Sequence, residues 1–388
     1  MEESFKTGER ARPATAADLD GIARLLTLAF GFDRARADEY LGHVGVGALH
    51  VVEDAEGRLL ATAALLPTAH VLGGAPVPAA SIAHVAIAPE ARGRGLARPF
   101  MDALCRSARE GGAAVVSLFA SARPVYRKCG FELAGSEVVY EADLSALPQA
   151  SATFEPMDPR DPRIAAAYAR KAVVGAGLIE RSASHWDELL REPKGAVAAY
   201  GLGGDRLDAY LILDTRDPAC LDIRDWHAAD GASARALLAF LGRFRSVYPI
   251  ARWHGAPQDD LVGAMPDKGW RLVHQEEWLL RVLDPVAALG ARRYLPARAA
   301  VGLRLLAADG SDLTSLRLEI EDGRGQVMKG SGKEPTVSLT LAALGSLLTG
   351  FRSATVLARR GDLTGDERAL RACDLAFAGP APWVAEHF

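Results

Sequence analysis

Apolar and polar positions over residues 11–148 alternate between the period of a strand and the period of a helix. The spacing of Ile22, Leu25, Leu26 and Phe30 on one face predicts a helix that Asp18 can cap. Short apolar runs predict strands at 49–53, 59–67, 85–88 and 115–119, with a helix over 96–109 before the last of them. This order of elements predicts an α/β domain over residues 1–148.

The same pattern repeats over residues 149–284. Helices are predicted at 163–174, 184–191 and 232–248, and strands at 197–202, 207–213, 220–226 and 270–283. Gly203, Gly204 and Asp205 form the turn of a second hairpin. We therefore expect a second domain that is built like the first.

Residues 285–388 have a different pattern, in which strands come first and helices follow. Strands are predicted at 303–306, 316–320, 326–329 and 337–340, and helices at 341–348 and 366–377. Strands followed by helices are typical of an α+β domain. The last nine residues carry two prolines and end in Phe388, which favours a docked terminus over a frayed one.

The stretch from His84 to Arg98 carries the clearest chemistry. A buried strand stops at Pro89, and Gly93 and Gly95 stand between arginines just before a helix. Such a turn directs several backbone N–H groups at one point, where the helix dipole adds partial positive charge, so it is typical of a phosphate cradle. Neither the Gly-Lys-Ser/Thr of a nucleotide P-loop nor a Gly-x-Gly-x-x-Gly with a later acid is present.

The second domain lacks this cradle. Its strand at 220–226 is followed by His227-Ala-Ala-Asp230-Gly231, with one glycine and no arginine, before the next helix. We interpret it as a degenerate copy that packs against the first domain and shapes a cleft there. His227 is either a structural histidine, the commoner case after a strand, or a catalytic base.

Composition and charge limit the class of protein. The 388 residues are 49% hydrophobic and 24% charged, as in a globular chain of two to three domains. A net charge of -4 means that the chain has no overall excess of basic residues, so we expect no nucleic-acid partner. A mildly acidic surface would instead suit a cationic substrate. The start is no secretory signal and no run could span a membrane, so we expect a cytoplasmic protein without membrane contact. The four cysteines show no paired spacing, which indicates neither a metal site nor a disulfide framework.

Two motifs resemble a known family. Arg92-x-x-Gly95-x-Ala97 after Pro89 resembles the acetyl-CoA loop of the GCN5-related N-acetyltransferases (GNAT), and Tyr126 before Gly130-Phe131 is similar to that family's tyrosine segment. With the degenerate repeat, the 278–284 junction and the aromatic terminus, the chain resembles the Eis (enhanced intracellular survival) family of multi-acetylating aminoglycoside acetyltransferases. This implies two tandem GNAT-like domains, the second degenerate, then a sterol carrier protein 2-like domain, assembled as a homohexamer.

The resemblance also implies roles for individual residues, with acetyl-CoA as the co-substrate and no metal. Tyr126 is the implied general acid, the C-terminal carboxylate of Phe388 the implied general base, and Glu386 a candidate contact for a polyamine substrate. The implied acetyl-CoA contacts are Val85, Ala86, Ile87, Arg92, Gly93, Arg94, Gly95, Leu96, Ala97, Arg98, Ser121 and Ala122.

These roles agree with the chemistry of acetyl transfer to an amine. A protonated amine is no nucleophile, so a carboxylate must take its proton, and a phenol such as Tyr126 can protonate the departing thiolate. The bland interpretation of Tyr126 is a packed ring with a bonded hydroxyl. Direct transfer in a ternary complex needs no covalent intermediate, while a route through Cys129 has no histidine nearby in sequence to activate the thiol.

Two other functions stay open beside aminoglycoside acetylation. The same enzyme could act on protein lysines or on simple polyamines. The chain could instead be a lipid or sterol-binding protein that uses its C-terminal domain, although the intact Gly93 and Gly95 argue against a vestigial cradle.

Overall fold

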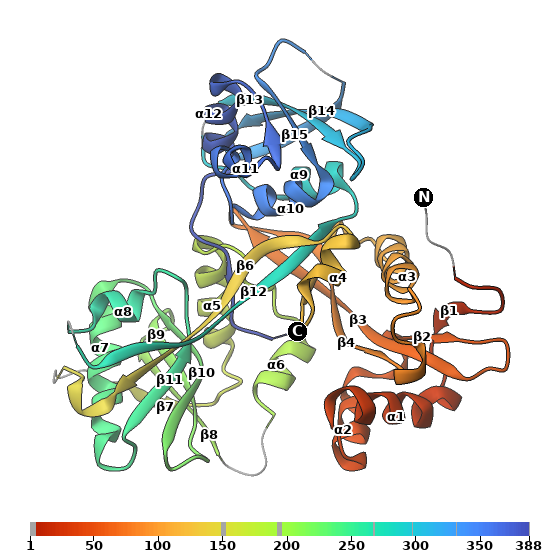
Figure 1. The fold of residues 1–388 in the computed structure, drawn as a ribbon. Helices are drawn as coiled ribbons and strands as arrows, with labels where there is room; N and C mark the ends of the chain where they lie inside the picture. The colour runs from red at the N-terminus through yellow and green to blue at the C-terminus, as the bar shows by residue number, and fades with distance from the viewer. Residues whose placement is uncertain are drawn as a thin grey trace.

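Three groups of elements make up the molecule, and the third stands above the other two in Figure 1. The computed structural model describes residues 5–148, 153–191, 196–266, 268–296, 298–330 and 332–387. None of the helices within these ranges is long and apolar enough to cross a membrane.

The first group contains the predicted strands and helices, together with two helices and two strands that the sequence pattern did not predict. Its elements are β1 (Arg10–Pro13), α1 (Leu19–Phe30), α2 (Arg34–Val44), β2 (Leu49–Glu53), β3 (Leu59–Leu72), β4 (Ala75–Ile87), α3 (Ala97–Glu110), β5 (Val115–Phe119), α4 (Arg123–Lys128) and β6 (Glu132–Asp143). Helix α2 was missed because it buries only Ala37 and Leu41, too few apolar positions for a helical stripe.

The second group follows the predicted order, with one helix that ends early and three short elements that were not predicted. Its elements are β7 (Glu155–Met157), α5 (Pro162–Val174), α6 (Ala183–Leu189), β8 (Val197–Gly203), β9 (Leu207–Asp214), β10 (Cys220–Ala228), α7 (Gly231–Leu241), β11 (Ile250–His254), α8 (Asp260–Ala264) and β12 (Trp270–Val282). The helix predicted over 232–248 ends at Leu241 and continues as a 3₁₀ turn, and β7, α8 and β11 were not predicted.

The third group is a separate five-stranded sheet with helices packed on it. Its elements are α9 (Pro285–Ala291), β13 (Ala299–Leu306), β14 (Asp312–Glu321), β15 (Arg324–Lys329), β16 (Thr336–Thr340), α10 (Leu341–Thr349), α11 (Ala354–Arg360), β17 (Leu363–Thr364), α12 (Glu367–Ala376) and, in the tail, β18 (Trp383–Val384). Its strand order is β15-β14-β13-β16-β17, and β18 belongs to the other sheet.

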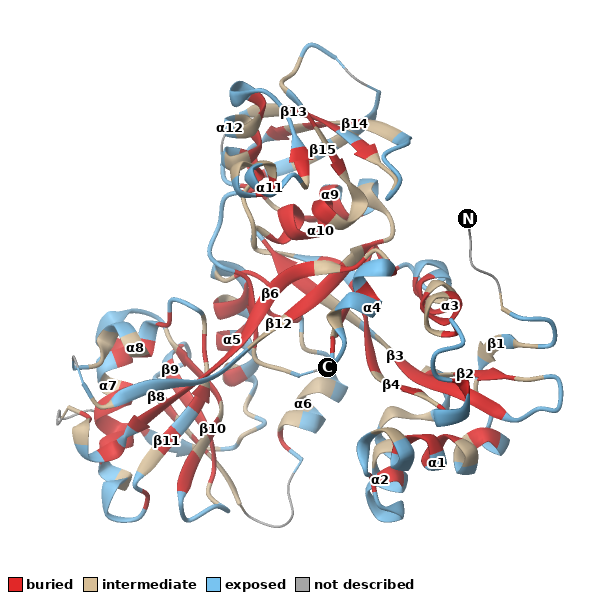
Figure 2. Ribbon diagram, in the orientation of Figure 1, coloured by how far each residue is buried: buried red, intermediate tan, exposed pale blue. Residues whose placement is uncertain are grey.

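The first two groups share one sheet instead of forming two. The described strands run in the order β1-β2-β3-β4-β5-β12-β6-β11-β10-β9-β8-β7, with β18 attached to β6. Strand β12 therefore lies between β5 and β6, although about 130 residues separate it from β6 in the chain. Long strands β6 and β12 cross the centre of the molecule, and both are largely buried there (Figures 1 and 2).

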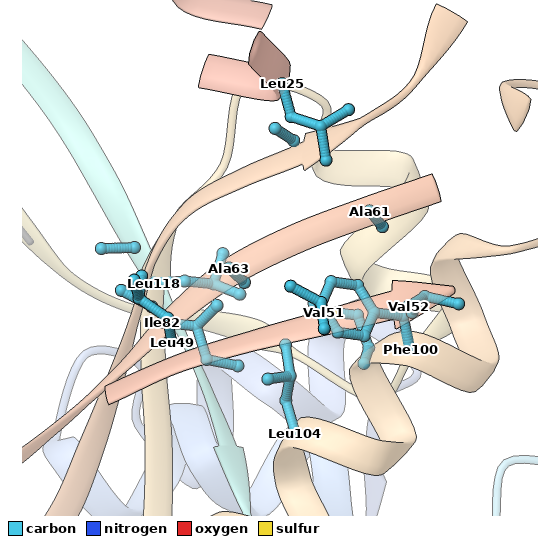
Figure 3. Packing of buried hydrophobic residues seen from close by; sticks show 14 of the residues in the cluster. Leu25, Leu49, Val51, Val52, Ala61, Ala63, Ile82, Phe100, Leu104 and Leu118 are labelled. Carbon is cyan, nitrogen blue, oxygen red and sulfur yellow. The ribbon is translucent and has the colours of Figure 1, made fainter. Parts of the chain in front are cut away.

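The core of the first group fixes the positions of β4 and α3. Leu25 of α1 and Leu104 of α3 lie on either side of the strands in Figure 3, and both are at most 1% exposed. Strand residues such as Val51, Ala63 and Ile82 belong to the same buried cluster. Burial of this apolar surface holds the end of β4 against the start of α3, which is where the predicted cradle lies.

Candidate active site

The predicted cradle lies at the point where β4 ends and α3 begins. Gly93 and Gly95 have φ angles of 73° and 84°, a backbone conformation that disfavours side chains. A Cβ atom added at either glycine would meet no protein atom within 4 Å, so the turn faces open space. The structure brings together here the predicted set Val85, Ala86, Ile87, Arg92, Gly93, Arg94, Gly95, Leu96, Ala97 and Arg98.

The turn is held by its own arginines and leaves the helix start uncovered. Arg92 Nε donates to the carbonyl of Ile87 at 3.1 Å, and Arg94 pairs with Glu9 at 2.9 Å. Helix α3 has no side-chain cap, so its first N–H groups and the positive end of its dipole are available to an anion. These features fit the pyrophosphate of acetyl-CoA.

Strands β4 and β5 run side by side for only a short distance. Their parallel ladder joins residues 79–81 to residues 115–117, and β4 then continues to Ile87 without β5. A bulge bends β4 at His84, whose φ angle of 50° lies in the left-handed region. A pocket of about 570 Å³ opens there, with Val85 of β4 and Phe119 of β5 in its wall.

Aromatic side chains from the first group line one side of this pocket. The rings of Phe30, Phe32 and Tyr40 lie 5.2, 5.6 and 4.4 Å from the ring of His84. Burial raises the pKa of Tyr40 and lowers the pKa of His84. No sequence pattern indicated this aromatic wall, because its members belong to separate elements and Tyr40 lies on α2, which the pattern missed.

Contacts between charged or ionisable side chains join α2 to α6 and the residues just after it, on another side of the pocket. His43 Nε2 lies 2.9 Å from a carboxylate oxygen of Glu188, and Arg191 lies 3.3 Å from Glu39. All four side chains line the pocket, which also includes Glu276 of β12. The second group thus contributes to the wall, as its predicted role in shaping a cleft requires.

Tyr126 of α4 reaches the same pocket from the cradle side. The residue is only 9% exposed, and its ring packs edge-on against Phe131 at 6.2 Å. Burial raises the pKa of Tyr126 to about 12, so the phenol is protonated at neutral pH and can donate a proton. Of the other predicted contacts, Ser121 lines the pocket and Ala122 directly precedes α4.

The C-terminal tail is docked along the shared sheet, as its sequence predicts. The backbone N–H of Ser136 donates to Pro382 at 3.1 Å, and that of Trp383 donates to Ala176 at 2.8 Å. His387 stacks on Phe119 with ring centres 4.0 Å apart and lines the pocket. Phe388 lies outside the described residues, so the role predicted for its carboxylate stays a prediction.

Within the described part of the chain, three acids near the first helices and the tail, Asp20, Asp33 and Glu386, are not part of the pocket wall. Glu386 pairs with the buried Arg181 at 2.5 Å, and Arg181 also contacts Asp225. Asp20 pairs with Arg34 at the surface, and Asp33 caps α2. The substrate contact predicted for Glu386 stays a prediction, and Glu276, which the sequence did not single out, is the acid of β12 that lines the pocket.

The second group has no cradle at the corresponding place, in agreement with the sequence. Asp230 occupies the start of α7, where its carboxylate accepts the N–H of Ser233 at 2.8 Å. His227 lies inside β10 and is 6% exposed, and burial lowers its pKa to about 4. It lies away from the pocket that holds Tyr126.

Three protein families match successive parts of the chain. Residues 10–134 and 177–282 each match an acetyltransferase (GNAT) domain, and residues 263–385 match a sterol carrier protein domain. The predicted fold class is therefore confirmed. The last two matches both contain β12, the strand that the second group inserts into the sheet of the first.

Relatives of known sequence and a relative of known structure are similar to most of the chain. The chain is 29% identical over 337 residues to N-acetyltransferase Eis of Mycobacterium tuberculosis, which covers 80% of each chain. It is 29% identical over 344 residues to an uncharacterized N-acetyltransferase of Streptomyces griseus, covering 79% of this chain and 77% of the other. A crystal structure of a GCN5-related N-acetyltransferase from Anabaena variabilis superposes with a TM-score of 0.90 at 27% identity, over 98% of this chain and 100% of that one.

Proposed function

We propose that this chain, which belongs to the Eis family of GCN5-related N-acetyltransferases, transfers acetyl groups from acetyl-CoA to the amines of aminoglycoside-like polyamines. One observation carries the proposal. A single pocket contains Val85 and Ser121 of the predicted acetyl-CoA contacts, the phenol of Tyr126, and carboxylates from three different elements. Donor and acceptor can therefore meet in one space, as direct transfer in a ternary complex requires.

The pocket wall suits a small molecule with several ammonium groups. Glu39, Glu188 and Glu276 place three carboxylates in this wall, beside the guanidinium groups of Arg36 and Arg191, so ammonium groups of a substrate have acids with which to pair. Aromatic rings supply flat faces on which a cation can also rest. A volume of about 570 Å³ lies in the range of small-molecule sites.

Four parts of the chain would divide the chemistry. Bound acetyl-CoA supplies an activated thioester. Backbone N–H groups of residues 85–87 polarise its carbonyl, and the N–H groups of residues 92–97 hold its pyrophosphate. The carboxylate of Phe388 takes a proton from the acceptor ammonium, and Tyr126 gives its proton to the departing thiolate.

The test is thiol release from acetyl-CoA with aminoglycosides, simple polyamines and lysine peptides as acceptors, using protein with its native C-terminus. We expect release with several aminoglycosides and more than one acetyl group per drug by mass spectrometry. Release with peptides or simple polyamines alone would keep the acetyltransferase and discard the drug substrate. A fluorescent fatty acid that binds while acetyl-CoA does not would favour the lipid-binding alternative.

The base has its own test. Two residues added after Phe388 move the terminal carboxylate without touching the cradle, so turnover should fall about 100-fold while acetyl-CoA affinity stays the same. The same two residues added at the N-terminus are the control. Unchanged turnover in the extended protein would remove the carboxylate from the mechanism.

We further propose that the chain works in the cytoplasm, where acetyl-CoA is made, and assembles as the hexamer that its resemblance implies. Light scattering on a sizing column measures the mass of the assembly directly. A monomeric peak at the concentration used for turnover would contradict the hexamer and leave the chemistry untouched.

A further inference from the structure

Three histidines and two glutamates converge beside the pocket, around Glu137 of β6. His387 Nδ1 lies 3.1 Å from one Glu137 oxygen and His254 Nδ1 lies 3.4 Å from the other. His274 Nε2 lies 3.9 Å from Glu137 and 3.8 Å from Glu276. We call Glu137, His254, His274, Glu276 and His387 the His/Glu cluster.

The topology of the sheet creates this cluster. Glu276 of β12 stands directly opposite Glu137 on the neighbouring strand. On the other side of β6, the tail strand β18 pairs with Ser136 and Glu137, just beyond the end of β11 at His254. Four strands from distant parts of the sequence therefore meet at Glu137.

The cluster holds two carboxylates, and the basic groups paired with them among the described residues are histidines. Glu137 is 4% exposed, and among the described residues its partners within 4.0 Å are the three histidines, with no lysine or arginine. A buried carboxylate is normally paired with a cation or bound to a metal. Two carboxylates opposite each other on neighbouring strands also repel, so the site favours a positive charge between them.

The spacing of the donor atoms fits a divalent transition metal. Ligand atoms of Glu137, His274 and Glu276 all lie within 4.8 Å of one another. Ligands about 2.0–2.1 Å from a tetrahedral zinc ion lie about 3.3 Å apart, and His274 Nε2 lies 3.9 Å from Glu137 and 3.8 Å from Glu276. The ring nitrogens of His254 and His387 are not part of this group of three. Imidazole and carboxylate donors without a thiolate suit Zn²⁺, Co²⁺ or Ni²⁺ more than Ca²⁺ or Mg²⁺.

We propose that Glu137, His274 and Glu276 of the His/Glu cluster bind one divalent transition-metal ion of the Zn²⁺ class, and that this ion fastens the C-terminal tail through Glu137, the carboxylate to which His387 Nδ1 hydrogen-bonds at 3.1 Å. His387 stands next to the chain end and stacks on Phe119 in the pocket wall. Binding here would therefore set how firmly the end of the chain is held beside the acceptor. The site departs from the expectation of no metal, which rested on the spacing of the cysteines and on the family resemblance.

The experiment measures Co²⁺ binding to the full chain, purified without a polyhistidine tag and stripped with a chelator. We expect one Co²⁺ per chain, with the visible absorption of four-coordinate cobalt and displacement by Zn²⁺. His274→Ala should weaken binding by a factor of about ten or more, because the half-exposed His274 side chain can be removed with little effect on folding. Glu276→Gln should weaken it as well.

His43→Ala is the matched control. His43 also lines the pocket and also contacts a carboxylate, but that carboxylate is Glu188, on the opposite wall. Its loss should leave Co²⁺ affinity within a factor of two of the unchanged chain. No binding to the unchanged chain, equal binding by His274→Ala, or equal weakening by His43→Ala would each overturn the proposal.

A second measurement tests the fastening of the tail. A serine carboxypeptidase, which needs no metal itself, removes residues from a free chain end. Zn²⁺ should slow this removal several-fold in the unchanged chain and not in His274→Ala. Equal rates with and without Zn²⁺ would overturn the fastening role. Neither measurement involves acetyl transfer, so the metal site and the proposed enzyme can fail independently.

Discussion

Two helices occupy equivalent places in the two acetyltransferase-like groups, and they differ in what stands at their N-terminus. Helix α3 joins the parallel pair β4 and β5, and α7 joins the parallel pair β10 and β11. The turn before α3 is open and glycine-rich, whereas the carboxylate of Asp230 fills the start of α7. The same topology therefore leaves a helix start open to an anion or fills it with a carboxylate, depending on a few residues at one helix end.

The next connection differs in the same way. After β5, α4 presents Tyr126 to the pocket. After β11, Asp259 turns inward, and its Oδ1 accepts the N–H groups of Leu261 and Val262 at the start of α8. The first group uses a connection to present a reactive side chain, and the second uses the equivalent connection for internal structure.

The largest expected effect comes from Tyr126, which the first group presents to the pocket. Tyr126→Phe keeps the ring and removes the proton donor, so turnover should fall between about 100- and 10,000-fold with acetyl-CoA affinity unchanged. Since burial raises the pKa of Tyr126 to about 12, the donor stays protonated, and turnover of the unchanged chain should show no loss from this group up to about pH 10. Steady-state kinetics against pH measure both; full activity in the variant would reduce Tyr126 to a packed ring.

Gly95→Asp places a carboxylate at the start of α3 and so makes it resemble the start of α7, where Asp230 stands. A carboxylate at the start of α3 repels the pyrophosphate and strains a φ angle of 84°, so acetyl-CoA affinity should fall about 100-fold by calorimetry. Gly310→Asp is the control, because Gly310 has the same φ angle and nothing within 4 Å of its Cβ position. Equal losses in both variants would point to general strain instead of a blocked cradle.

Asp259 should make the second group pH-sensitive. Burial raises its pKa to about 6, against a lowering by Lys171, so the folded protein holds this proton more tightly than the unfolded chain does. The stability it contributes is full below pH 4 and is lost as pH rises through 6, by about 3 kcal/mol at pH 7. Asp259→Asn keeps an acceptor for α8 and cannot titrate.

Denaturant unfolding from pH 4 to pH 7 measures this difference. The variant should gain stability relative to the unchanged chain by about 2 kcal/mol over that interval, because the unfolded carboxyl is already partly ionised at pH 4. Asp230→Asn, which alters an exposed helix cap, should show no such gain. A pH-independent difference for Asp259→Asn would mean that its carboxyl titrates normally in the folded protein.

The smallest expected effect comes from removing the carboxylate of Asp230 at the start of α7. Asp230→Ala removes a helix cap and should lower the melting temperature by about 2 °C. It should create no second acetyl-CoA site, because no arginine of the sequence stands between Trp226 and Ala232 to hold a phosphate. Two molecules of acetyl-CoA per chain by calorimetry would contradict this account of the degenerate group.

Local features of the molecule could be predicted from the sequence, and features made by distant contacts could not. Gly93, Gly95 and the helix after them were predictable because strand end, turn and helix start are adjacent in the chain. The aromatic wall around His84 depends on a bulge in β4 and on a weakly patterned helix. The His/Glu cluster draws on positions 137, 254, 274, 276 and 387, which no spacing rule connects.

The insertion of β12 between β5 and β6 has a consequence for how the chain matures. During synthesis, residues 115–143 leave the ribosome long before residues 270–282, which are their partners in the sheet. Until then β5 and β6 expose unpaired backbone groups, which are prone to pairing with other chains. The N-terminal acetyltransferase-like part therefore cannot reach its final form before the second part is made, and slow long-range pairing should limit its folding rate.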